Sequence, residues 1–208
     1  MSVTVLHNAI DFIKLCGKQV DSEFHLEGEM IGNYEKLFVY LFQPARCEQF
    51  GLNHNKGLYI YGSPGAGKSF AFKVMKQMIL FASDNGMLDI SERFPIIPFI
   101  EIQRQYKKES EEIFELYGRG CKKTLGIDEM FHDISYTGSG YGGKKIDLSA
   151  ELITDRHLLF TEEKIKTHLT SNIHIAGVQS LLENDGSKRF DDRTVRRLDE
   201  MFTELWWK

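Results

Sequence analysis

The chain has 208 residues, of which 42% are hydrophobic and 27% charged, and its formal net charge is −4. This length allows one sizeable core, and the weakly negative charge means that any contact with nucleic acid must come from a local basic patch. The three cysteines are widely separated, which argues against a disulfide framework and against a structural zinc site. No membrane-spanning run and no charged-then-apolar leader is present, so the expected location is cytoplasmic, without a membrane partner.

The first expected element is an amphipathic helix over residues 3–16. Apolar side chains recur there at helical spacing, at Val3, Leu6, Ala9, Ile10, Ile13 and Cys16. Such a face packs either on the body of the same domain or on a partner protein. A second apolar helix is expected over residues 34–42, ending near Pro44.

Residues 57–69 hold the most informative pattern in the chain. They read Gly-Leu-Tyr-Ile-Tyr-Gly-Ser-Pro-Gly-Ala-Gly-Lys-Ser, an apolar run that leads into the pattern G-x-x-x-x-G-K-S. A strand is expected at 58–61 and a helix at 70–81, which is the context that a phosphate-binding loop requires. The alternative is a glycine-rich turn that only joins a strand to a helix.

The predicted loop supplies donors for a nucleotide and a ligand for its metal. Its glycines let successive backbone N–H groups point into a concavity that holds the β-phosphate. Lys68 is expected to reach the β- and γ-phosphates, and Ser69 to ligate Mg²⁺ at the start of the helix. The expected nucleotide-binding residues are Gly62, Ser63, Pro64, Gly65, Ala66, Gly67, Lys68, Ser69 and Phe70.

The remaining elements continue an alternation of strands and helices. Further strands are expected at 95–102, 123–129 and 166–172, and a charged helix at 106–117. This order predicts an α/β protein of the P-loop NTPase type, with a parallel sheet between two helical layers. Ligands of such folds sit at the carboxyl ends of the strands.

The strand expected at 123–129 ends in two carboxylates, Asp128 and Glu129. Charges at the end of an apolar run are costly unless they meet a cation, and a phosphate-binding loop brings Mg²⁺. Asp128 is therefore the candidate for the metal shell, through Ser69 and water. Glu129 is the candidate that polarises the attacking water. The alternative is a pair of solvated acids at a strand end.

Asn172 is the last residue of the strand expected at 166–172. Its amide there could hold the attacking water or a γ-phosphate oxygen without adding charge. An asparagine after a strand is also a common turn residue. Its position after the loop and the acidic pair favours the catalytic interpretation.

These blocks resemble, in order and content, the AAA+ ATPases, and within them the group of DnaC-type helicase loaders and IstB-type transposition helpers. The resemblance rests on residues 56–69, 125–130, 167–173 and 189–202. It implies an N-terminal helical segment, 1–28, and an AAA+ ATP-binding domain, 29–208. The chain after Asn172 is too short for the full C-terminal helical lid of larger members.

The resemblance also implies roles for residues near the end of the chain. Asn172 matches the sensor-1 position, and Arg197 matches the arginine finger that completes the site of a neighbouring subunit, with Arg193 as the second candidate. A homo-oligomer is therefore implied. Because acids are interleaved with these arginines, a solvated helix face with ion pairs is the alternative.

Two further segments suggest partners. The stretch 131–145 contains Tyr136, Tyr141, Lys144 and Lys145, whose aromatic and basic character suits single-stranded DNA, although a flexible surface loop would look the same. Trp206 and Trp207 are expected to cover the core, or else to dock on a partner.

Together, the residues and the resemblance predict an ATPase that uses ATP and Mg²⁺ and acts in DNA replication. The expected task is to load or remodel a replicative helicase on single-stranded DNA. The alternatives are a transposition helper of the IstB type, a nucleotide-switched binding module and a small-molecule kinase. A kinase usually needs a mobile lid over its acceptor, whereas an acidic pair beside a polar strand end suits water.

Overall fold

The computed structural model describes residues 9–109, 112–131, 137–139, 145–181 and 189–208. Its elements are α1 (Ala9–Val20), α2 (Glu29–Phe42), η2 (Pro44–Phe50), β1 (Gly57–Tyr61), α3 (Lys68–Asp84), η3 (Ile90–Glu92), β2 (Ile96–Pro98), α4 (Phe99–Glu109), α5 (Glu112–Leu116), β3 (Leu125–Met130), β4 (Thr137–Ser139), β5 (Lys145–Asp147), α6 (Leu148–Glu163), β6 (Thr167–Ser171), α7 (Ile175–Val178), α8 (Asp192–Met201) and β7 (Phe202–Trp206). Among the described residues, no helix is long and apolar enough to cross a membrane.

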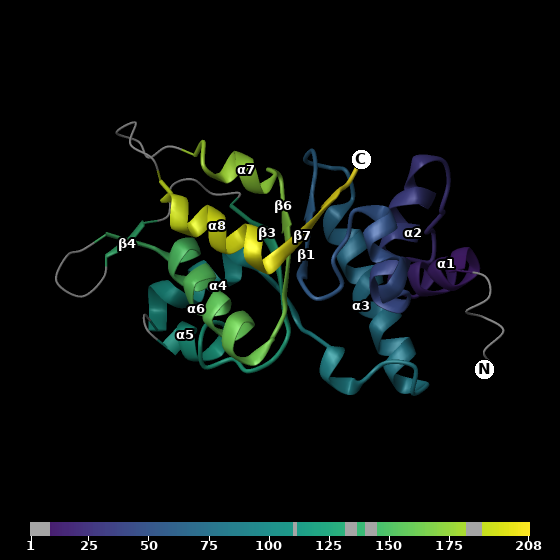
Figure 1. Cartoon of the computed structure of the whole chain (residues 1–208), viewed down its shortest axis with the longest axis horizontal. Coiled ribbons are helices and arrows are strands. Elements are labelled where there is room, and N and C mark those ends of the chain that lie inside the picture. Colours follow the sequence, from purple (N-terminus) through teal and green to yellow (C-terminus); the bar gives the residue numbers. More distant parts are fainter. Residues whose placement is uncertain (1–8, 110–111, 132–136, 140–144, 182–188) are drawn as a thin grey trace.

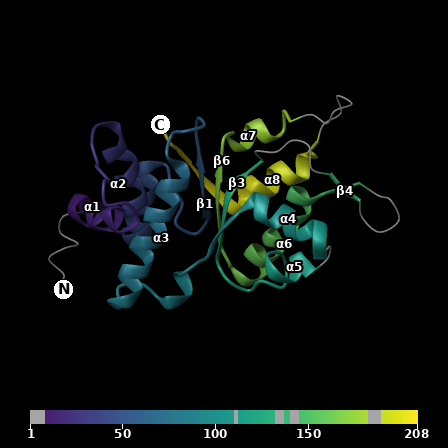
Figure 2. The same cartoon turned by 180° about the vertical axis from the view of Figure 1, so that it is seen from behind.

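Five parallel strands form the central sheet, in the order β2-β3-β6-β1-β7. Helices α1, α2 and α3 cover one face, and α4, α6, α7 and α8 lie on the other (Figures 1 and 2). Strands β4 and β5 form a separate antiparallel pair. The predicted three-layer αβα fold with a parallel sheet is therefore confirmed.

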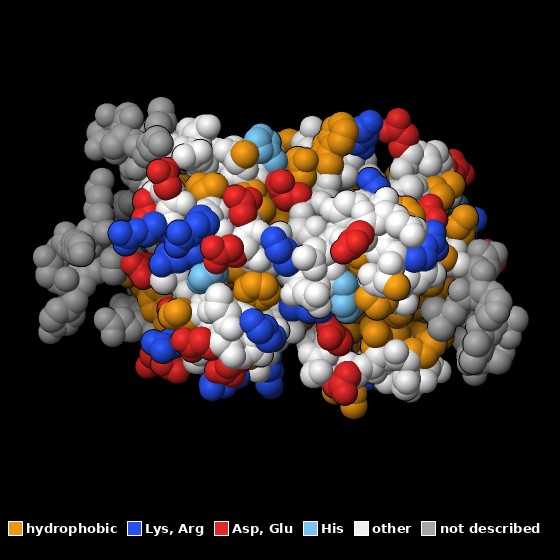
Figure 3. All heavy atoms as spheres, viewed as in Figure 1, with side chains coloured by type: hydrophobic (Ala, Val, Ile, Leu, Met, Phe, Trp, Pro, Cys, Tyr) orange, Lys and Arg blue, Asp and Glu red, His pale blue; other side chains and the backbone are white. Residues whose placement is uncertain are grey.

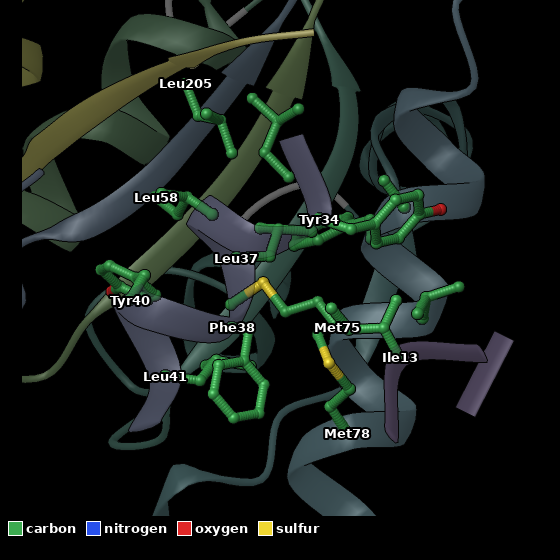
Figure 4. Packing of buried hydrophobic residues seen from close by; sticks show 14 of the residues in the cluster. Ile13, Tyr34, Leu37, Phe38, Tyr40, Leu41, Leu58, Met75, Met78 and Leu205 are labelled. Atoms are coloured by element: carbon green, nitrogen blue, oxygen red, sulfur yellow. The ribbon is translucent and has the colours of Figure 1, made fainter. Parts of the chain in front are cut away.

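The helices α1, α2 and α3 share one hydrophobic core with the sheet. Leu58 of β1 and Leu205 of β7 meet side chains of α2 and α3 in this core (Figure 4). Helix α1 belongs to the same core, because Phe12 and Ile13 are fully buried. The described part of the predicted N-terminal helix thus packs on the body of the chain, while its first positions lie outside the described residues.

One predicted strand is wrong in extent. Strand β2 covers only Ile96–Pro98 instead of 95–102, and helix α4 begins at once at Phe99. Phe99, Ile102 and Tyr106 are all buried at helical spacing, so packing of this helical face overrides the strand propensity of the apolar run. Of the helix predicted at 106–117, the structure describes residues 106–109 as the end of α4 and Glu112–Leu116 as α5, and residues 110–111 lie outside the described residues.

Strand β7 was not predicted, although it completes the sheet. It pairs in parallel with β1 from Gly57 opposite Phe202 to Tyr61 opposite Trp206. Trp207 is buried, as expected, whereas the Trp206 residue is 53% exposed, so only one of the two tryptophans covers the core.

Candidate nucleotide-binding site

Residues 62–67 join β1 to α3 at the carboxyl edge of the sheet. Gly65 and Gly67 have φ angles of 79° and 87°, in the left-handed region that side chains with a Cβ enter only at a cost. Gly67 is the residue that caps α3, and Lys68 is the first helical residue. The chain therefore has the strand, glycine turn and helix that the predicted phosphate-binding loop requires.

The start of the loop is held between two neighbouring strands. The Gly62 N–H donates to the carbonyl oxygen of Ser171 at 3.3 Å, and the Trp207 N–H donates to Tyr61 at 2.7 Å. A Cβ on Gly62 would lie 2.0 Å from the carbonyl oxygen of Trp207. Only glycine fits here, and the reason is this backbone contact. This contact between the Trp207 backbone and the loop was not predicted, because it depends on the unpredicted pairing of β7 with β1.

Lys68 carries a buried positive charge inside the loop. Its residue is 6% exposed, and its Nζ donates to the carbonyl oxygens of Gly62 and Ser63 at 2.9 and 2.8 Å. Burial lowers the pKa of Lys68, while Glu129 and Asp128 act in the opposite direction. None of the ion pairs in the described ranges includes this ammonium group. A buried cation whose direct partners are neutral fits an incoming phosphate.

The acidic pair lies on a β-bulge. Ile127 pairs with Leu169 and Met130 with Ser171, so Asp128 and Glu129 together stand opposite a single residue of β6. Glu129 has a φ of 59°, a left-handed conformation that is uncommon for a residue with a side chain. Bulges and such backbone outliers re-aim side chains and are found next to functional sites.

One buried hydroxyl holds the bulge in place. Thr170, the residue opposite the acidic pair, is fully buried, and its Oγ1 accepts a hydrogen bond from the Glu129 N–H at 2.8 Å. The same hydroxyl donates to Oδ1 of Asp128 at 2.5 Å. Sequence reasoning missed Thr170. A signal existed, because Thr170 lies two residues before Asn172 in the strand predicted at 166–172, and residues so spaced on a strand share a face.

The bulge explains how both acids can serve one site. Adjacent strand residues normally point to opposite faces, so Asp128 and Glu129 could not both serve one site on a regular strand. In the structure the irregularity lies within the strand, since β3 continues past the acidic pair to Met130. Asp128 is half-buried and Glu129 is exposed.

The sheet order brings most of the predicted site together. Strand β6 lies between β3 and β1, so the acidic pair and the loop after β1 flank its carboxyl end. Asn172, half-buried, follows that end directly. The influence of Asp128 and Glu129 on the pKa of Lys68 agrees with this closeness.

The candidate arginine fingers lie on α8, which packs against α6. Arg197 is half-buried, and its Nη1 donates to Oγ1 of Thr154 on α6 at 2.7 Å, whereas Arg193 is exposed. The alternative of a salt-bridged face applies to Arg196, which pairs with Glu200 at 3.5 Å. In this chain Arg197 is therefore engaged with its own α6.

The predicted DNA-binding stretch is largely outside the described residues. Tyr136, Tyr141 and Lys144 lie there, and Lys145 is described only as the backbone of the first residue of β5.

No family model matches the chain. Among curated proteins, it is similar to the vesicular-fusion protein Sec18 of Schizosaccharomyces pombe, with 28% identity over 114 residues. That match covers 47% of this chain and 14% of Sec18. The chain therefore corresponds to a small part of that relative.

Solved structures match almost the whole chain. The DnaC helicase loader has a TM-score of 0.56 and 19% identity, over 91% of this chain and 96% of that one. DnaI has a TM-score of 0.56 and 17% identity, over 92% and 90%. AMPPCP-bound DnaA from Aquifex aeolicus has a TM-score of 0.51 and 17% identity, over 87% and 48%. At these identities the likeness shows the fold: the chain has the AAA+ fold of the DnaC and DnaI proteins, as the resemblance implied.

Proposed function

We propose that the chain is a Mg²⁺-dependent ATPase that acts in DNA replication by loading or remodelling a replicative helicase on single-stranded DNA. The observation that carries this proposal is a site with two parts at one edge of the sheet. One part is a buried lysine in a glycine loop, and the other is a pair of carboxylates that a single hydroxyl holds in place. The fold supports the choice of activity, since DnaC is described as a helicase loader and DnaA as a replication initiator.

The nucleotide would bind in the loop 62–70. Most of its residues between Gly62 and Lys68 are exposed, so a phosphate group can reach the loop. Lys68 would exchange its contacts with the loop carbonyls for phosphate oxygens. Ser69 in the first turn of α3 and the half-buried Asp128 would hold Mg²⁺, which shields phosphate charge. The similar DnaA structure is AMPPCP-bound, which supports a nucleotide as the ligand.

Hydrolysis would depend on Glu129 and Asn172. The exposed carboxylate of Glu129 is available to accept a proton from water, and the bulge sets its direction. Asn172, at the neighbouring strand end, would orient that water or a γ-phosphate oxygen. Both groups sit at the carboxyl edge of the sheet, where ligands of α/β folds bind.

A neighbouring copy of the chain would complete the site. We propose that Arg197, or else Arg193, reaches the γ-phosphate bound to the next subunit and stabilises the charge that develops during transfer. The exposed position of Arg193 suits such a contact without rearrangement, while Arg197 would first have to leave Thr154.

A phosphate-release assay with and without single-stranded DNA tests this proposal. Turnover that rises with DNA supports the replication ATPase. The choice of DNA as the stimulus is supported by the similar DnaA structure, which is bound to single-stranded DNA. Tight nucleotide binding without release would instead indicate a nucleotide-switched module. Nucleotide consumption that needs a small acceptor would indicate a kinase. An ATPase whose activity needs a transposase rather than a helicase would indicate a transposition helper.

A further inference from the structure

A hollow lies at the amino edge of the sheet, opposite the edge that carries the candidate nucleotide site. It has a volume of about 610 Å³, and three segments line it: 90–93, 122–124 and 163–166. These segments precede β2, β3 and β6. The surface is indented at the lower edge of the molecule in Figure 3, with blue and red side chains around the indentation.

The lining of this amino-edge hollow is positively charged. It contains two carboxylates, Glu92 and Glu163, against a larger group of cations: Arg93, Lys122, Lys123, Lys164 and Lys166. The chain as a whole is negative, with a formal net charge of −4. The hollow therefore concentrates positive potential on a molecule that otherwise repels anions weakly.

A further cation lies beneath the hollow. Arg156 of α6 is fully buried, and its guanidinium donates to the carbonyl oxygens of Cys121 at 2.8 Å, Lys123 at 2.9 Å and Lys166 at 3.1 Å. Its Nε donates to Oγ1 of Thr167 at 2.8 Å. All of these partners are neutral, so the charge of Arg156 adds to the potential. The same bonds tie two lining segments together and fix their spacing before any ligand arrives.

Two of the lining cations, Lys123 and Lys164, are available to an anionic partner. Lys122 pairs with Glu163 at 2.8 Å, and because the Lys122 side chain is exposed, this pair contributes little and exchanges easily. Lys166, whose side chain is only 15% exposed, pairs with Glu92 at 4.0 Å, and Arg93 pairs with Asp84 at 2.5 Å. Lys123 and Lys164 are exposed, and neither takes part in an ion pair within the described ranges. The Nζ of Lys164 donates to the carbonyl oxygen of Thr161, at 3.2 Å.

The apolar residues of the hollow indicate the class of anion. Ile90, which is 68% exposed, and Ile165 lie among the cations, and none of the described residues that line the hollow is aromatic. Binding of single-stranded nucleic acid relies on aromatic platforms for its bases, which are missing from this lining. Aliphatic side chains beside lysines suit a polypeptide that carries both carboxylates and aliphatic residues.

We propose that the amino-edge hollow docks an acidic, aliphatic segment of a partner protein. Carboxylates of that segment meet Lys123 and Lys164, and an aliphatic side chain covers Ile90. This inference goes beyond the proposed ATPase and does not depend on it, because it concerns the opposite edge of the sheet. The surface proposed for this partner protein is therefore separate from the stretch 131–145, which was expected to bind single-stranded DNA.

A fluorescein-labelled peptide of alternating glutamate and leucine, titrated against the full chain by fluorescence polarisation, tests the proposal. The double variant Lys123→Gln, Lys164→Gln should bind it about tenfold more weakly and with a flatter salt dependence. The matched control Lys14→Gln, Lys18→Gln changes the net charge equally on exposed positions of α1 and should bind as the unaltered chain does. Ile90→Ser should also weaken binding, and phosphate release should not change in any of these variants.

Three results would overturn the proposal. The first is an equal loss of affinity in both double variants, which would mean that net charge and not the hollow attracts the peptide. The second is no measurable binding of the peptide to the unaltered chain at low salt. The third is tighter binding of a labelled oligonucleotide than of the peptide, abolished by the Lys123 and Lys164 changes, which would make the partner a nucleic acid.

Discussion

The hydroxyl oxygen of Thr170 lies 2.8 Å from the backbone nitrogen of Glu129, and the same hydroxyl donates to the Asp128 carboxylate at 2.5 Å. A single buried side chain on β6 thus fixes the direction of the two acids on β3. Glu129 holds a left-handed backbone there, with a φ of 59°. Such a conformation persists only where neighbouring contacts stabilise it.

We predict that Thr170→Val slows ATP hydrolysis by about 10- to 100-fold, the range seen when a group that orients a catalytic ligand is removed. Valine keeps the shape but leaves the Glu129 N–H without its acceptor. Nucleotide affinity should change little, since Lys68 and the loop remain intact. Thr170→Ser keeps the hydroxyl and should retain most of the activity. Phosphate release and equilibrium binding of a fluorescent ATP analogue measure the two effects, and equal rates in the valine and serine variants would argue against this role.

Local sequence patterns predicted the elements that carry the site. The apolar runs that become β1, β3 and β6 lead directly into their motifs, and each was located to within about two residues. Strand β7 was not predicted because no glycine or proline marks the boundary between α8, which ends at Met201, and β7, which begins at Phe202. Only its long-range pairing with β1 makes this segment a strand.

Details that depend on register between strands were also beyond the sequence. The two acids were recognised, but the bulge that aims them exists only because Ile127 and Met130 pair with residues of β6 that are two apart. The role of Thr170 in holding both acids follows from that register. The contact of the Trp207 backbone with Gly62 follows in the same way from the pairing of β7.

We predict that Gly62→Ala destabilises the chain by about 3 kcal/mol, at the upper end of the usual cost of overpacking. The added Cβ would lie 2.0 Å from the Trp207 carbonyl oxygen, so the end of β7 must move. Gly65→Ala is the control, because its Cβ would meet nothing within 4 Å, and its positive φ should cost only about 1 kcal/mol. Urea unfolding compares the two variants, and similar midpoints would contradict the steric account.

We predict that the chain loses stability below about pH 6.5 through His168. This residue is 2% exposed, and its Nδ1 accepts the Leu58 N–H at 3.0 Å. Burial lowers the pKa of His168 to about 3, with Lys166 and Arg156 adding to the effect. Between this value and the unfolded pKa of about 6.5, the unfolded chain binds more protons, so the free energy of unfolding falls by up to about 1.4 kcal/mol per pH unit as the pH decreases.

His168→Asn keeps an acceptor for Leu58 but cannot be protonated in this range. The free energy of unfolding of this variant should therefore depend less on pH between 6.5 and 4.5 than that of the unaltered chain. Above about pH 7.5, where His168 is neutral in the folded and the unfolded state, it should contribute nothing to the pH dependence. Urea titrations at several pH values measure the slopes. Identical slopes would show that His168 is not the responsible group.

We predict that Arg197→Ala lowers ATP turnover without weakening nucleotide binding, because its guanidinium acts on the nucleotide of a neighbouring subunit. Mixing this variant with Glu129→Gln subunits should restore part of the activity, at interfaces where an intact Glu129 meets an intact Arg197. Arg193→Ala, tested in the same way, decides which arginine acts. A mixture that co-assembles and stays inactive for both arginines would rule out action in trans.

The central claim, that the loop binds ATP and Glu129 activates water, is tested most directly by comparing nucleotide affinity and phosphate release in Lys68→Ala and Glu129→Gln. The first variant loses the buried ammonium that now contacts Gly62 and Ser63, and it should bind ATP poorly. The second keeps the loop, and it should bind ATP with the affinity of the unaltered chain while releasing almost no phosphate. Equal losses of affinity and turnover in both variants, or full turnover in Glu129→Gln, would contradict the account.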